Sequence, residues 1–81
     1  MSHPTEDRLK EILSKVFLID KDEVSDDLSR KDVQEWDSMG HLMLITEVES
    51  TFGVFINDED LTKIKTVGDI KEVLRRLGLA I

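Results

Sequence analysis

The sequence predicts an all-α fold, a four-helix bundle of three longer helices and one short helix, with a long loop between the first two. Three segments, near residues 5–18, 37–52 and 66–77, carry apolar residues at helical spacing. The one apolar run that suggests a strand has no partner segment with which to form a sheet. With 81 residues, 40% of them hydrophobic, the chain is long enough for one compact domain, residues 1–81, and too short for two.

The first helix is expected from about residue 5 to about residue 18. Its apolar stripe follows the spacing i, i+3, i+4, i+7, i+8: Leu9, Ile12, Leu13, Val16 and Phe17. Thr5 is the expected N-cap, with Glu6 and Asp7 in the first turn, where the helix dipole favours anions. Residues 19–37 then form a polar connection, and a loop of this length needs anchors in the core. The expected anchors are Val24, Leu28, Val33 and Trp36.

A second helix should begin at Asp37-Ser38 and run to Phe52, with Gly53 ending it as a left-handed cap. At about 100° per residue, one broad face is apolar: Leu42, Leu44, Ile45, Val48 and Phe52. The opposite face carries Met39, Gly40, Met43, Thr46, Glu47 and Ser50. Two methionines one turn apart on the outward face are unexpected in a helix whose only role is packing.

The remaining chain predicts a connector and two further helices. Val54-Phe55-Ile56 should be an extended connector buried against the helices. Asn57 or Asp58 should cap a short helical turn over residues 59–64, and the Thr66–Asp69 segment resembles a capping box. The last helix carries an apolar stripe before a stop at Gly78: Val67, Ile70, Val73, Leu74 and Leu77.

The charge balance limits the classes of partner. Acidic residues outnumber basic ones by 18 to 11, for a net charge of −7, so phosphate backbones and anionic lipids would repel the chain. We therefore expect no nucleic-acid or membrane binding, and partners with basic patches. The absence of cysteine excludes disulfides, thiolate metal sites and a cysteine nucleophile. The first seven residues lack signal-peptide features and no apolar run spans a membrane, which predicts a cytoplasmic protein, expected to be monomeric.

The one compact motif that could carry chemistry is Asp37-Ser38-Met39, at the start of the second helix. The simplest interpretation is a helix cap, and a cap serine can also be modified. A catalytic pair of Ser38 with His41, oriented by Asp37, fails because the carboxylate must stand beyond the histidine and not beside the serine. No Gly-x-Ser-x-Gly elbow is present either. We therefore predict no catalytic residue and interpret His41 as a packed or loop-bonded histidine.

The acidic loops do not match a calcium site. An EF-hand loop beginning at Asp20 would need Gly at its sixth position and Glu at its twelfth, where Ser25 and Lys31 stand. A loop beginning at Asn57 places Leu61 at the fifth position, where an oxygen ligand is required. The sequence predicts no metal site.

The segment from Glu35 to Leu42, with the amphipathic helix that ends at Gly53, resembles the signature of acyl carrier proteins. In that family the motif is Asp-Ser-Leu, and its serine receives 4′-phosphopantetheine from coenzyme A. The similarity extends over nearly the whole chain, through the long loop, the Phe-Gly-Val-Phe-Ile exit, the acidic turn at residues 57–61 and Thr66-Val67. It implies an acyl-carrier-like bundle that holds acyl groups as thioesters on the phosphopantetheine arm attached to Ser38 and catalyses nothing itself. A separate phosphopantetheinyl transferase would modify Ser38.

The resemblance also implies roles for the neighbouring residues. Asp37 and Met39 would help the transferase recognise the site. The residues implied to meet partner enzymes are Met39, Met43, Glu47, Asp58, Glu59 and Asp60. A pocket for an acyl chain would lie between the second and third helices, although each candidate is also an ordinary core residue: Leu42, Ile45, Val54, Ile56 and Leu61.

Three residues depart from the family pattern. Met39 replaces the usual Leu, Met43 stands where an acidic residue is common, and Gly40 stands where many members have Asp. The outward face of the second helix is therefore more apolar than usual. The resemblance implies a carrier in fatty acid, polyketide or related specialised biosynthesis. The more apolar face favours a dedicated partner set outside primary fatty-acid synthesis, with basic or mixed apolar docking patches. Trp36 is a further cue for specialised pathways, and it would serve equally as a loop anchor.

Two alternatives to an acyl carrier remain at this point. A carrier of aminoacyl or peptidyl groups shares the fold and the modified serine. An unmodified helical interaction module would use the methionine face to dock a partner helix. Modification at Ser38 separates the two carriers from the interaction module.

Overall fold

The computed structural model describes residues 4–81. Its elements, in chain order, are α1 (Pro4–Phe17), the short 3-10 helix η1 (Lys21–Glu23), α2 (Ser38–Phe52), α3 (Asp58–Lys63) and α4 (Val67–Arg76). Within these residues the only β-type pairing is one isolated bridge between Ser29 and Thr66. The all-α fold, with three longer helices, one short helix and a long first loop, is confirmed.

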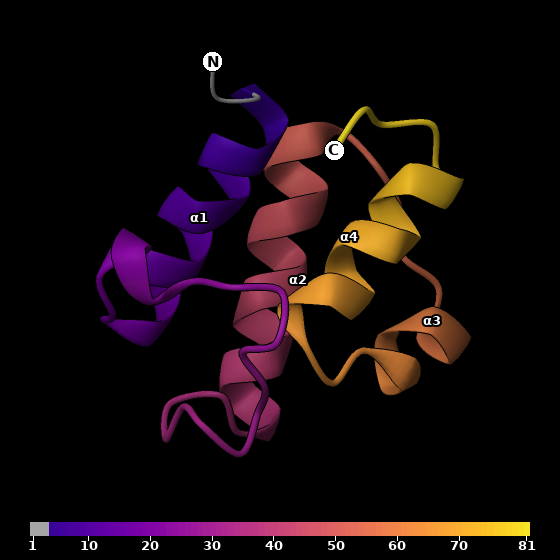
Figure 1. Cartoon of the computed structure of the whole chain (residues 1–81). Helices are drawn as coiled ribbons and strands as arrows, with labels where there is room; N and C mark the ends of the chain where they lie inside the picture. The colour runs from indigo at the N-terminus through magenta and orange to yellow at the C-terminus, as the bar shows by residue number, and fades with distance from the viewer. Residues whose placement is uncertain (1–3) are drawn as a thin grey trace.

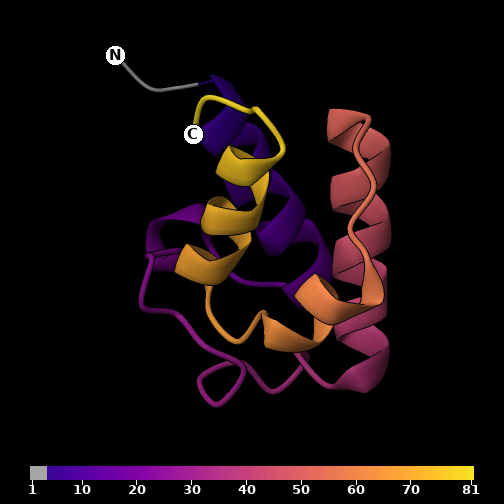
Figure 2. The same cartoon turned by 90° about the vertical axis from the view of Figure 1, so that its right-hand side faces the viewer.

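The three longer helices pack around a shared core. In Figure 1, α1 and α4 lie on either side of α2, and Figure 2 shows that both cover the same side of it. The start of α1 and the C-terminus lie at one end of the bundle, and the start of α2 lies at the other. None of the helices in the described part of the chain has both the length and the apolar character needed to cross a membrane.

Helix α1 begins earlier than the sequence predicts. It starts at Pro4, so Thr5 lies inside the first turn and the prediction of an N-cap there is wrong. Proline suits this position because its fixed φ is helical and the first turn has N–H groups without intrahelical partners. Four residues of the predicted stripe are buried: Leu9, Ile12, Leu13 and Phe17. The fifth, Val16, is half-buried against the core.

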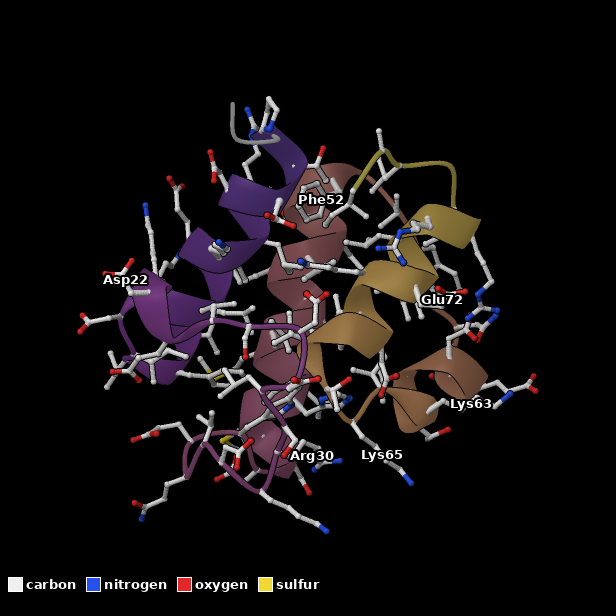
Figure 3. All side chains as sticks on the ribbon, viewed as in Figure 1. Asp22, Arg30, Phe52, Lys63, Lys65 and Glu72 are labelled. Atoms are coloured by element: carbon white, nitrogen blue, oxygen red, sulfur yellow. The ribbon has the colours of Figure 1, made fainter. Side chains whose placement is uncertain are left out.

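The long loop is anchored as predicted. Val24, Val33 and Trp36 are buried and Leu28 is partly buried against the core. Backbone hydrogen bonds also tie this loop to the start of α4, including Arg30 N to Lys65 O at 3.1 Å. Arg30 and Lys65 are accordingly neighbours in Figure 3.

Helix α2 has the predicted bounds and caps. Asp37 is its N-cap, and Gly53 ends it in the left-handed conformation with φ 65°. Leu44, Ile45 and Val48 are buried in the core, and Phe52 packs partly buried against it. Two assignments to its faces are wrong: Leu42 is 56% exposed, and Gly40 is buried.

His41, which lies within or at the edge of the predicted apolar arc of α2, is buried, whereas Leu42 is exposed. Its Nδ1 accepts a hydrogen bond from Trp36 Nε1 at 2.9 Å, so Nε2 carries the ring proton and donates to the Leu61 carbonyl at 2.9 Å. His41 is 4% exposed, and the Trp36 ring stacks on Phe17 with centroids 5.0 Å apart. One imidazole thus joins the long loop, α2 and α3, which confirms the packed, loop-bonded histidine.

The connector between α2 and α3 alternates sides, as an extended chain does. Ile56 is 3% exposed and its N–H donates to Glu49 Oε2 at 2.8 Å, whereas Phe55 is 75% exposed. The expectation of a fully buried connector is therefore wrong at Phe55. Helix α3 is capped by Asn57, whose side chain accepts from Asp60 N at 2.8 Å.

Helix α4 opens with the predicted capping box. Thr66 Oγ1 accepts from Asp69 N and Asp69 Oδ2 accepts from Thr66 N, each at 3.1 Å. Asp therefore fills the role for which Glu is more usual. The predicted stripe is buried at Val67, Ile70, Val73 and Leu74. Leu77, the C-cap, is 43% exposed, because the helix ends one residue before it.

A close approach at Gly40 fixes the loop against the start of α2. A Cβ built on Gly40 would lie 2.0 Å from the Glu35 carbonyl oxygen, far inside van der Waals contact. The segment before Trp36 therefore lies directly on the helix backbone. This contact accounts for the burial of a residue that the sequence placed on the outward face.

A buried lysine joins α1, the long loop and α4. Lys71 is 7% exposed, and its Nζ lies 2.7 Å from both Glu6 Oε2 and Asp26 Oδ1. Burial lowers the pKa of Lys71, but the hydrogen bonds that its ammonium donates to Asp26 and Glu6 outweigh this effect and leave that pKa above its usual value. The same hydrogen bonds lower the pKa of Glu6 and of Asp26.

Gly40→Ala should destabilise the protein. In an exposed helix this change stabilises by up to about 1 kcal/mol, whereas here the added methyl must displace backbone, which costs on the order of 1–3 kcal/mol. Gly68→Ala is the matched control, because its Cβ would lie 3.2 Å from the Asp26 carbonyl. Urea unfolding should show the larger loss for Gly40→Ala, and a Gly40→Ala variant as stable as the parent would contradict the packing.

Lys71→Met should lower the free energy of unfolding by about 1 kcal/mol at pH 7. It should also make that free energy depend less on pH in the acid range. Because both carboxyl pKa values are lowered, the ion pairs stabilise fully above the ordinary values of 4.5 and 3.8. Their contribution is lost as the pH falls through the lowered values. Thermal unfolding from pH 7 to pH 3 should therefore change less in Lys71→Met than in the parent.

Lys63→Met is the control for that experiment, since the ion pair of Lys63 with Glu59 is solvent-exposed on both sides. It should leave the pH profile unchanged. Equal profiles for the parent and Lys71→Met would contradict a stabilising role for the buried cluster.

Candidate functional site

Ser38 is the first residue of α2 and is exposed to solvent, at the end of the bundle where the long loop enters the helix (Figure 1). Asp37 Oδ1 accepts from Gly40 N at 2.8 Å, and the Asp37 carbonyl accepts from His41 N at 2.8 Å. The first N–H groups of a helix lack intrahelical partners and its dipole favours negative charge there. A phosphate ester on the Ser38 hydroxyl would lie at this favourable end.

His41 is not placed to activate Ser38 as a nucleophile. Both ring nitrogens of His41 are engaged, one with Trp36 and the other with the Leu61 carbonyl. The imidazole is buried among the elements it joins, whereas Ser38 faces solvent. The catalytic pairing weighed on sequence grounds is therefore absent from the geometry. Residues 4–81 also contain no cluster of carboxylates and imidazoles arranged to hold a metal ion.

The outward methionines are exposed as predicted. Met39 is 73% exposed and Met43 is 54% exposed, and Leu42 joins them at 56%. Beside them, Glu47 is half-buried and its carboxylate lies 3.5 Å from Lys15 Nζ on α1. The acidic residue expected on this face is therefore partly neutralised by its own chain.

Met39, Leu42 and Met43 line an apolar groove between α1 and α2. Its volume is about 340 Å³, and its lining is Lys15, Val16, Met39, Leu42, Met43, Thr46 and Glu47. The groove begins one residue after Ser38. The sequence did not predict it, because periodicity within α2 gives no information on how closely α1 approaches.

The acidic turn divides into two kinds of residue. Asp58 and Glu59 are exposed, and Glu59 lies 3.4 Å from Lys63 in a solvent-exposed pair. Asp60 instead accepts a hydrogen bond from Arg76 Nη2 at 2.9 Å, with 19% of its side chain exposed. Asp60 thus fastens α3 to α4, a contact between distant residues that no local pattern in the sequence indicates.

The residues suggested for an acyl pocket between α2 and α3 are divided between the core and the α1–α2 groove. Ile45 and Ile56 are each 3% exposed in the core, and Val54 and Leu61 pack partly buried against it. Leu42 lies in the groove with α1 instead. The hydrogen bond of His41 to the Leu61 carbonyl joins α2 to α3 at this interface.

Known proteins match the chain in sequence and in fold. The family model described as "Phosphopantetheine attachment site" matches residues 7–74. An acyl carrier protein of Lactobacillus johnsonii is 32% identical over 68 residues, which cover 84% of this chain and 85% of that protein. A solved structure of a candidate acyl carrier protein from Mycobacterium tuberculosis is 26% identical, with a TM-score of 0.81, and the match covers 90% of this chain and 97% of that one.

The exposed serine at the start of α2 and these matches agree with one another. Such carriers hold a covalently attached 4′-phosphopantetheine and interact with phosphopantetheinyl transferases and biosynthetic enzymes. The chain belongs to the acyl carrier protein family, whose members carry phosphopantetheine and are not enzymes.

Proposed function

We propose that Ser38 bears the phosphopantetheine arm and that the chain presents acyl thioesters to the enzymes of a specialised biosynthetic pathway. The observation that carries this proposal is the exposed Ser38 hydroxyl at the first position of α2, with Asp37 capping the helix beside it. The chain has no cysteine, so the arm would supply the thiol that carries the cargo.

The residues around Ser38 suit that attachment. The unpaired N–H groups and the dipole of a 15-residue helix favour the phosphodiester anion. Asp37 caps the first turn by accepting a hydrogen bond from Gly40 N. Its side chain and that of Met39 are exposed, so a transferase can contact both. In this proposal Ser38 is the substrate of the transferase, and Asp37 and Met39 are its recognition residues.

Partner enzymes would meet a mixed apolar and acidic surface. Met39 and Met43 supply the apolar part, and methionine side chains adapt to varied shapes. Glu47 contributes less free charge because of Lys15, Glu59 because of Lys63 and Asp60 because of Arg76. Asp58 and the solvent-exposed Glu59 are the acidic residues most accessible to a partner. Such a surface suits docking patches that combine basic and apolar residues. We also propose that the protein is monomeric and cytoplasmic.

Ser38→Ala should abolish modification. Intact mass is measured before and after incubation with coenzyme A and a promiscuous phosphopantetheinyl transferase. The parent should gain one phosphopantetheine and Ser38→Ala none, because the acceptor hydroxyl is gone. Ser50→Ala is the control, since Ser50 is an exposed serine further along α2 and should leave the gain intact. No gain in folded, unmodified parent protein would favour the unmodified interaction module.

Met43→Glu should improve loading by a generic fatty-acid malonyl transferase. It places on α2 the acidic residue common in fatty-acid carriers, and a solvent-exposed ion pair contributes up to about 1 kcal/mol, which corresponds to about fivefold in kcat/KM. The measurement is kcat/KM for malonyl transfer onto the modified protein, with Ser50→Glu as a control of equal charge. Equal efficiency for the parent, Met43→Glu and a standard fatty-acid carrier would contradict a dedicated partner set.

A further inference from the structure

Three basic side chains gather in one place on this acidic chain. Arg30 and Lys31 of the long loop and Lys65, just before α4, line a hollow of about 470 Å³ together with Ser29 and Thr66. The chain as a whole has a net charge of −7, so this basic cluster of Arg30, Lys31 and Lys65 is a local reversal of sign. In Figure 3, Arg30 and Lys65 lie at the end of the bundle where α2 begins.

Backbone pairing holds the basic cluster in place. The antiparallel bridge joins Ser29 to Thr66, which sets Arg30 opposite Lys65, and Arg30 N donates to Lys65 O at 3.1 Å. Like charges directly opposite each other in such a pair are destabilising. The position of these two cations is therefore fixed by the backbone and is not explained by packing within the chain.

The chain does not neutralise the basic cluster. Across residues 4–81, most of the other basic residues lie within ion-pair distance of a carboxylate: Lys15, Lys21, Lys63, Lys71, Arg75 and Arg76. In the same part of the chain, no carboxylate lies within that distance of Arg30, Lys31 or Lys65. Lys31 and Lys65 are exposed and Arg30 is half-buried, so their charge is open to a partner.

Two carboxylates beside the basic cluster bind the backbone instead. Asp32 Oδ2 accepts from Ser29 N at 3.0 Å and from Ser29 Oγ at 3.1 Å. Asp69 Oδ2 accepts from Lys65 N at 2.9 Å and from Thr66 N at 3.1 Å. These N–H groups are therefore engaged, whereas protein sites for phosphate commonly use free backbone N–H groups. The ligand of the basic cluster is consequently one that side-chain cations can bind by themselves.

We propose that the basic cluster docks a carboxylate-rich segment of a partner protein. Carboxylates match this donor set, because an Arg guanidinium binds them through paired hydrogen bonds and a Lys ammonium acts as a point charge. A nucleic acid or an anionic membrane would extend beyond the cluster over the acidic remainder of the chain, which would repel it. A short acidic segment avoids that repulsion.

The binding does not need the arm on Ser38, but its use in delivery rests on the proposed function. An enzyme that acts at Ser38 approaches the end of the bundle where the basic cluster also lies. Its basic or apolar patch would meet Met39 and Met43 while its acidic segment meets the cluster. Contacts of opposite sign at two places fix the orientation of the carrier, because other orientations bring like charges together.

The first test is an NMR titration of isotope-labelled protein with an end-blocked hexaglutamate peptide. The amide signals of Arg30, Lys31, Lys65 and Thr66 are expected to shift. An uncharged hexaglutamine peptide should leave them unchanged. The shifts should also disappear in about 1 M NaCl, where the screening length falls to about 3 Å. No shift at these residues, or shifts confined to other basic residues, would overturn the proposal.

The second test compares two variants with the same change of charge. Lys65→Gln should raise the Kd for hexaglutamate by about two- to fivefold, the range expected for an exposed ion pair. Lys63→Gln is the control, because Lys63 stands two residues earlier, is exposed and already pairs with Glu59 at 3.4 Å. It should change the Kd much less. Equal losses in the two variants would show an effect of net charge alone and would contradict a docking site.

Further measurements separate the other possible occupants. Inorganic phosphate that shifts the same amide signals at the same concentration as hexaglutamate would identify a general anion site and overturn the proposal. Cluster signals that shift with protein concentration alone would identify the acidic turn of a second copy as the occupant, with the same consequence.

The titration is run on the unmodified protein and on protein whose modification has been verified by mass. A chain that binds hexaglutamate but gains no mass at Ser38 speaks against the carrier alone. A chain that is modified at Ser38 but does not bind hexaglutamate speaks against the basic cluster alone.

Discussion

The double hydrogen bond of His41 is the constraint on which the rest of the structure depends. Its imidazole is buried between the Trp36 indole and the Leu61 carbonyl, so the long loop, α2 and α3 are joined at one side chain. Leaving either partner unpaired in the core would cost on the order of 1–3 kcal/mol, which makes other rotations of α2 unfavourable. The stacking of Trp36 on Phe17 extends the same connection to α1. The orientation of α2, and with it the exposure of Ser38, follows from this arrangement.

The features that the sequence predicted correctly depend on nearby residues. The caps at Asp37, Asn57 and Thr66, and the left-handed Gly53, are signals contained within a few residues. Helix bounds followed from apolar spacing for the same reason. The errors lie where distant contacts decide. Periodicity placed Leu42 on the buried face and indicated a packed or loop-bonded His41 without its partners, because no sequence pattern revealed that the loop offers His41 a donor and α3 offers it an acceptor.

The same division applies to the candidate site. Ser38 could be singled out because its motif, its position at a helix start and its family resemblance all occur within one segment. Two ion pairs could not be predicted, since each joins residues on different helices: Asp60 with Arg76, and Glu47 with Lys15. These pairs reduce the free negative charge that a residue count suggests. Contact with the loop explains why Gly40 stands where many family members have Asp. The Glu35 carbonyl lies so close to the helix that no Cβ fits at this position.

The start of α2 combines a fixed helix with an adaptable surface. The hydrogen bonds of His41 hold α2 in one orientation, whereas Met39 and Met43 leave more than half of their surface in water. Methionine side chains adapt to varied shapes, so partner enzymes of different shape could dock on these residues without any change in the bundle. A partner that had to open the hydrogen bonds of His41 would instead make delivery depend on the stability of the fold.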